Sequence, residues 1–169
     1  MKPMQNVKPS VPVWQCLQVL DANGQNTSEN PANQVVGINV PNTTLQGDAR
    51  EIVVNNYFMR NGFTPLEGKC GTNCFDGVFV KGDKVYIVET KPLGADGTIK
   101  LSPEDGLLPP QMTNAWIESR AKALIDINKL DLKATGETIL QAFKPDSKIE
   151  LVRVIAGADS KGVTLVKLK

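Results

Sequence analysis

Three charged side chains stand out in an otherwise apolar stretch, FDGVFVKGDKVYIVETK, which spans residues 75–91. Asp76 lies at its beginning, and Glu89 and Lys91 lie at its end. Carboxylates bind hard divalent cations such as Mg²⁺, and an ammonium group beside them can orient or deprotonate a water molecule that attacks phosphorus. These residue types therefore indicate metal-dependent phosphodiester hydrolysis, provided that the fold brings the three side chains together.

The pattern around these residues predicts a β-hairpin. Two runs of alternating apolar residues flank a Gly-containing turn at residues 81–83, which is a strong hairpin signal. Pairing of the two strands would place Asp76 opposite the end of the second strand, where Glu89 and Lys91 leave the same face. The alternative is a surface ion pair between Glu89 and Lys91 with Asp76 in a turn, which is the commoner explanation of an isolated D…ExK spacing.

The sequence of 169 residues contains no histidine. Histidine-metal nucleases, histidine acid/base ribonucleases, Ser-His and Cys-His hydrolases and His-ligated zinc sites all need an imidazole, so these classes are excluded. The net charge of +1 gives no general basicity, and the apolar content of 41% is ordinary for a globular protein. An enzyme built from this chain must use carboxylates, lysines and a divalent metal ion.

The three cysteines are Cys16, Cys70 and Cys74. Cys70 and Cys74 stand in a Gly-containing loop just before Asp76, and they could form a disulfide, belong to a metal site or be two unrelated thiols. No apolar run reaches the roughly 18 residues that a membrane span needs, and the start lacks the pattern of a secretory signal. We therefore expect no transmembrane helix and no signal peptide.

Composition divides the chain into two parts. Residues 1–46 are rich in Asn, Gln and Pro and predict a leader or linker of loops, with an edge strand at 35–40. Residues 47–169 predict the compact domain. Within it, the stretch 92–110 is rich in Pro, Gly and Asp and predicts a long surface loop with a short strand at TIKL.

Periodicity predicts the other elements of this domain. Apolar residues at helical spacing predict helices at 48–60 and 111–130, and alternation predicts two final strands at 148–157 and 162–169. The order of helix, strands, helix and strands is typical of an α/β or α+β fold. We expect a central mixed β-sheet flanked by helices.

The order of these motifs resembles the PD-(D/E)xK phosphodiesterases, the restriction-endonuclease-like superfamily. In both, a helix precedes a hairpin that has Asp at its opening and an apolar strand ending in ExK, and a helix and a further strand follow; the resemblance covers about residues 47–156. More narrowly, FDGVF…VYIVETK and QMTNAWIESR resemble nuclease toxin domains at the carboxyl end of large exported proteins of bacterial contact-dependent growth inhibition, also called polymorphic toxins. The chain departs from the superfamily pattern at Phe75, which stands where a proline is usual.

The resemblance implies a role for each residue of the candidate site. Asp76 and Glu89 would bind a divalent metal ion (Mg²⁺, Mn²⁺ or Zn²⁺). Glu51 from the first helix would be a further metal ligand, with Asp48 as the alternate. Lys91 would act on the attacking water, so that Asp76, Glu89 and Lys91 form the catalytic set.

Two further residues are implied to contact the metal or the substrate. The carbonyl of Thr90 would complete the metal site, and Gln111, at the start of the second predicted helix, would face the substrate. Helix capping is the alternative role of Gln111. We interpret Trp116 as a core residue rather than as a platform for base stacking.

The implied function is that of a metal-dependent endonuclease toxin. It would form part of a larger exported protein, cut DNA in the cytoplasm of a competing bacterial cell, and be kept inactive in the producing cell by a cognate immunity protein. Cleavage of tRNA by the same site is the nearest alternative, because both substrates present a phosphate to the same metal. A non-catalytic binding domain, in which the hairpin is only packed, is the alternative from another class.

Overall fold

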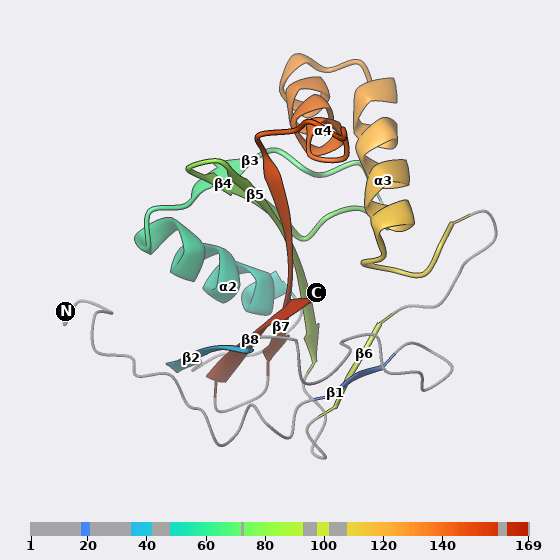
Figure 1. The fold of residues 1–169 in the computed structure, drawn as a ribbon. Coiled ribbons are helices and arrows are strands. Elements are labelled where there is room, and N and C mark those ends of the chain that lie inside the picture. The colour runs from blue at the N-terminus through green and yellow to red at the C-terminus, as the bar shows by residue number, and fades with distance from the viewer. Residues whose placement is uncertain are drawn as a thin grey trace.

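The structure is a computed structural model that describes residues 18–20, 35–41, 48–71, 73–92, 98–101, 108–158 and 162–168. These residues form three helices and eight strands (Figure 1). The helices are α2 (Asp48–Arg60), α3 (Asn114–Asp126) and α4 (Leu130–Gln141), and the strands are β1 (Gln18–Leu20), β2 (Val35–Pro41), β3 (Thr64–Leu66), β4 (Gly77–Lys81), β5 (Lys84–Pro92), β6 (Thr98–Lys100), β7 (Glu150–Ala158) and β8 (Gly162–Leu168).

Six of these strands form one mixed sheet in the order β2-β8-β7-β5-β4-β3. Strands β5 and β7 are parallel, and every other neighbouring pair in this sheet is antiparallel. The predicted edge strand at 35–40 is confirmed as β2, which pairs with β8. The short strand predicted at TIKL is confirmed as β6, which pairs in parallel with β1. Two pieces of the predicted leader are thus hydrogen-bonded to strands that come after residue 47.

Helices cover both faces of the sheet (Figure 1). One hydrophobic cluster joins α2 to the sheet and includes Phe58, Phe79 and Val88. A larger cluster joins α3 and α4 to the other face and includes Ile87 and Ile139. Central strand β5 is apolar at successive positions because both of its faces are buried. The predicted fold class, a central mixed sheet flanked by helices, is confirmed.

The predicted hairpin is confirmed as strands β4 and β5. Lys81 pairs with Lys84 across a two-residue turn, and Gly82 has φ +61°, which glycine adopts without steric cost. The last pair joins Gly77 to Val88, so the next residues outward, at 76 and 89, face each other. The pairing expected from the sequence is therefore the pairing observed.

The first predicted helix, 48–60, is confirmed residue for residue as α2, whereas the second prediction was wrong at both ends. Thr113 is the N-cap of α3, because its side chain accepts a hydrogen bond from the N–H of Trp116 at 3.2 Å. The helix ends at Asp126, and Asn128 then adopts φ +60°, a left-handed conformation that closes helices. The chain from 111 to 130 therefore contains a shorter helix than expected.

Helix α4, which lies between α3 and β7, was not predicted from the sequence. Its middle holds Thr135 and Gly136, residues of low helix propensity, and both are buried. Gly136 is required by close packing, since a Cβ there would lie 2.5 Å from the backbone oxygen of Ala121 in α3. Tertiary contact thus outweighs local propensity in α4.

In the described part of the chain, no helix combines the length and apolar character needed to cross a membrane.

Candidate functional site

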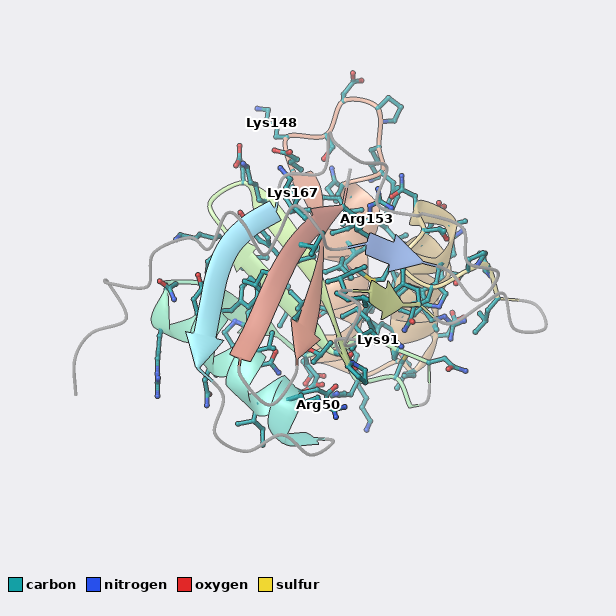
Figure 2. All side chains as sticks on the ribbon, turned by 90° about the horizontal axis from the view of Figure 1, so that it is seen from below. Arg50, Lys91, Lys148, Arg153 and Lys167 are labelled. Carbon is teal, nitrogen blue, oxygen red and sulfur yellow. A yellow bond between two sulfur atoms is a disulfide. The ribbon has the colours of Figure 1, made fainter. Side chains whose placement is uncertain are left out.

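Three carboxyl side chains from separate elements meet at one end of β5. Glu51 comes from the first half of α2, Asp76 immediately precedes β4, and Glu89 lies near the end of β5. Electrostatic and hydrogen-bond interactions link Asp76 to both Glu51 and Glu89. Lys91 follows on β5, and Figure 2 shows it at the same end of the sheet as Arg50. We call Glu51, Asp76 and Glu89 the carboxylate cluster.

Backbone hydrogen bonding positions Asp76. The N–H of Thr90 donates to Asp76 Oδ2 at 2.8 Å, which joins the beginning of the first hairpin strand to the end of the second. Thr90 therefore positions Asp76, a role that the sequence did not reveal, and the contact implied for the Thr90 carbonyl stays a prediction. This bond also leaves the second oxygen of Asp76 available to its carboxyl neighbours.

Glu89 is the most deeply buried acid of the cluster, with 4% of its surface exposed. Burial, followed by the charge of Asp76 and a hydrogen bond with it, raises the pKa of Glu89 to about 9, although the nearby ammonium of Lys91 opposes this shift. Glu89 Oε1 lies 3.7 Å from Lys91 Nζ. The other oxygen, Oε2, is buried and has no hydrogen-bond partner among the described residues.

Glu51 is more exposed than Glu89 and also interacts with Asp76. A hydrogen bond with Asp76, followed by burial and the charge of Asp76, raises the pKa of Glu51 to about 7. Lys69 opposes this shift, because its Nζ lies 3.6 Å from Glu51 Oε1. The structure thus brings Glu51 to Asp76, as the resemblance implied. Asp48, the alternate, begins α2, but its side chain lies outside the described residues.

The cluster fits a hard cation by its chemistry. All of its donors are carboxyl oxygens, which Mg²⁺ prefers, and Glu89 Oε2 is a buried acceptor that lacks a partner. Lys69 pairs with Glu51 Oε1, and Lys91 pairs with Glu89 Oε1. Among the residues described, no group of three or more acidic, Cys or His side chains has the geometry of a preformed metal cage. A bound cation would have to displace these lysines and draw the three carboxyls closer together.

Gln111 does not occupy the position expected for it. It precedes α3 instead of lying in it, and Thr113 takes the N-cap role that was the alternative for Gln111. Gln111 is nevertheless a buried polar residue. A hydrogen bond from strand β7 holds the turn that contains Gln111, because Arg153 Nη1 donates to the carbonyl of neighbouring Met112 at 3.0 Å.

A packed support lies beneath the cluster. Phe75 is buried and contacts Trp116 edge to face, with ring centroids 5.6 Å apart. Trp116 is 3% exposed, which confirms its interpretation as a core residue.

Cys70 and Cys74 form a disulfide that closes the loop between Lys69 and Phe75. Of the three alternatives for these cysteines, a disulfide, a metal site or two unrelated thiols, the disulfide is therefore the one observed. Cys16 lies outside the described residues.

Two cations near the cluster were missed by sequence reasoning. Lys69 contacts Glu51 from the disulfide loop, and no motif signals this contact. Arg50 precedes Glu51 on α2, and its Nε is buried without a hydrogen-bond partner among the described residues. A buried guanidinium nitrogen that lacks a partner beside an acidic cluster is the kind of group that binds a phosphate oxygen.

Known proteins add nothing to this geometry. No protein-family model, no curated protein and no solved structure matches the chain.

Proposed function

We propose that this protein is a metal-dependent endonuclease that hydrolyses phosphodiester bonds at the carboxylate cluster. The observation that carries the proposal is the meeting of Glu51, Asp76 and Glu89 beside Lys91, with one buried oxygen of Glu89 lacking a partner. A structural hairpin does not need this arrangement, because burying carboxyls costs free energy that pairing and protonation only offset. Perturbed acids at one end of a sheet are instead typical of functional sites.

Each residue has a distinct task in this proposal. Asp76, held by the N–H of Thr90, and Glu89 would bind the cation, with Glu51 as a further ligand. The cation would lower the pKa of an attacking water and offset charge on the phosphate. When Glu89 ionises, its salt bridge with Lys91 would strengthen, which keeps the Lys91 ammonium beside the water that attacks. Arg50 Nε is a candidate donor to a phosphate oxygen.

The biological setting is carried by the resemblance of the motifs. DNA is the favoured substrate, and tRNA is the alternative that uses the same site. We infer a toxin that is part of a larger exported protein, acts in the cytoplasm of a competing cell and is neutralised by a cognate immunity protein. The Cys70–Cys74 disulfide supports an exported protein, since disulfides persist mainly in oxidising surroundings outside the cytoplasm.

The test is incubation of the purified protein with plasmid DNA and with tRNA, in Mg²⁺, Mn²⁺, Zn²⁺ or EDTA. Cleavage is expected only with a divalent metal, and the substrate that is cut separates the two alternatives. Glu89→Gln should abolish cleavage, whereas Glu137→Gln, the same change at an exposed position of α4, should leave it intact. Intact DNA and tRNA under every metal condition would refute the proposal.

The competing candidate is a non-catalytic binding domain. It is favoured by the ion pairs of Lys69 with Glu51 and of Lys91 with Glu89, which occupy the carboxylates in the metal-free protein. Under that interpretation, Asp76→Ala, Glu89→Ala and Lys91→Ala would leave growth inhibition of recipient cells unchanged. Loss of inhibition in all three variants, with folding retained, would exclude it.

A further inference from the structure

A pocket lies at a distance from the carboxylate cluster, beside the carboxyl-terminal half of α2. Its volume is about 270 Å³, near the lower limit of about 300 Å³ for small-ligand sites. Aliphatic side chains of β7 and β8 line it together with four aromatic residues, which are Tyr57, Phe58, Phe63 and Tyr86. A cavity of this size and lining suits one flat ring system.

The aromatic walls are held in fixed orientations. Phe58 stacks on Phe79 with ring centroids 4.8 Å apart, and Phe63 meets Tyr86 edge to face at 4.8 Å. Tyr86 is only half-buried, so part of its ring is open to a ligand. Rigid aromatic rings lose little conformational entropy when they bind a second flat group, which favours stacking.

The charge at the pocket is positive. Among the described residues, the charged ones that line it are Lys84 and Lys167. Lys84 is paired with Glu150 at 3.6 Å, but both side chains are well exposed, and such pairs contribute little. Lys81 lies over the ring of Phe63, 4.6 Å from its centroid. Figure 2 shows Lys167 and Lys148 at one end of the sheet and Lys91 and Arg50 at the other.

The pocket lies within reach of a strand bound at the cluster. Tyr57 follows Glu51 by six residues of α2, which is about 9 Å along the helix axis. On β5, Tyr86 precedes Glu89 by about 10 Å and points to the opposite face. Because Tyr86 and Glu89 lie on opposite faces of the sheet, a polynucleotide would have to leave the cluster around α2 and then follow this helix for a few nucleotides, each of which rises about 3.4 Å when stacked.

These features together point to one ligand. We infer that the pocket binds an unstacked nucleobase of the substrate strand, with Lys84 and Lys167 contacting the flanking phosphates. Aromatic stacking combined with a basic rim is how single-stranded nucleic acid is bound without sequence preference. The inference rests on the proposed nuclease function, and it adds that substrates with unpaired bases bind better than a regular duplex.

The test is fluorescence anisotropy with a labelled single strand, the matching duplex and tRNA, all in EDTA so that nothing is cut. The single strand should bind more tightly than the duplex. Tyr86→Ala should weaken single-strand binding roughly 5- to 100-fold, the effect of losing one stacked base, while Tyr86→Phe should retain it. Lys167→Glu should weaken binding and reduce its salt dependence.

Lys133→Glu is the matched control, because Lys133 is an exposed lysine of α4 outside the pocket. It should change affinity less than twofold. Equal losses in Lys167→Glu and Lys133→Glu would overturn the inference even if Tyr86→Ala failed to fold. Equal binding of duplex and single strand, with no effect of Tyr86→Ala, would overturn it as well.

The two proposals can fail separately. Glu89→Gln should retain single-strand binding in EDTA while losing metal-dependent cleavage. A wild-type protein that binds through Tyr86 and cuts nothing would end the nuclease proposal and leave the pocket in place. If the wild type cuts DNA or tRNA with metal, and Tyr86→Ala binds the single strand as tightly as the wild type does, the pocket inference fails and the nuclease proposal stands.

Discussion

The two ends of strand β5 are built differently: the acidic end gathers the carboxylate cluster, whereas the basic end carries the partly exposed Lys84. At one end, Glu89 is buried, its pKa is raised by burial and by Asp76, and one of its oxygens has no partner among the described residues. At the other end, Lys84 reaches solvent and pairs weakly with Glu150. Burial makes the charge of the carboxyls at the acidic end depend on pH and on bound cations. Solvent exposure leaves Lys84 at the basic end able to change partners at little cost. Chemistry is therefore expected at the first end and sequence-tolerant binding at the second.

The largest expected effect separates the two ends by activity. Lys91→Ala should lower metal-dependent cleavage by about 10²- to 10⁴-fold, since it removes the ammonium beside the attacking water. Lys84→Ala makes the same change at the other end and should mainly weaken substrate binding. Initial cleavage rates at saturating and subsaturating substrate will separate the two effects. Equal rate losses in both variants would break the comparison between the ends.

A second prediction concerns pH and metal. The pKa of Glu89 is about 9 and that of Glu51 about 7 in the folded protein, both above their ordinary value of 4.5. Raised carboxyl pKa values stabilise the fold fully below the unfolded value, and this contribution is lost as pH rises through the folded values. The metal-free protein should therefore lose thermal stability between about pH 5 and about pH 9.

Thermal denaturation in EDTA across this range measures the effect. Glu89→Gln, which stays neutral, should lose less stability than the wild type as the pH rises. A divalent cation should raise the wild-type Tm most at high pH, where it takes the place of the lost protons. A Tm that rises with pH in EDTA would contradict the raised pKa values of Glu51 and Glu89.

The disulfide should have a smaller effect. Because Cys70 and Cys74 close a short loop, reduction should cost about 2 kcal/mol of unfolding free energy. Chemical denaturation with and without a thiol reductant measures this difference. The acidic end should respond more strongly than the basic end, since the loop also carries Lys69 to Glu51. Unchanged stability under reduction, with free thiols verified, would show that the loop is held by packing alone.

The smallest expected effect lies at the basic end. Glu150→Gln removes the partner of Lys84, an exposed pair that contributes between about 0 and 1 kcal/mol. Stability should hardly change, while single-strand affinity should rise slightly because one negative charge near the pocket is lost. Denaturation and anisotropy on the same variant test both statements. A large loss of stability would show that the basic end is as tightly built as the acidic end.

Much of the acidic end could be predicted because it depends on local pairing. Alternating apolar residues and a tight turn determine which residues of a hairpin face each other, so Asp76 and Glu89 could be paired from the sequence. The first helix was likewise predicted to its ends, since its apolar spacing and a following Asn-Gly are both local signals. Helix α4 escaped because Gly136 and Thr135 serve contacts with α3, which local propensity does not register.

The sequence alone determined the lack of histidine chemistry, the mixed sheet flanked by helices and the hairpin that joins two acids to a lysine. Only the tertiary structure decided that Glu51, implied by resemblance alone, reaches Asp76 and also pairs with Lys69. It also decided that an aromatic pocket forms beside α2. Hairpin pairing depends on neighbours within a few residues. Burial and the meeting of side chains from distant elements depend on how helices pack on the sheet, and those contacts set the pKa of Glu89 and the shape of the pocket.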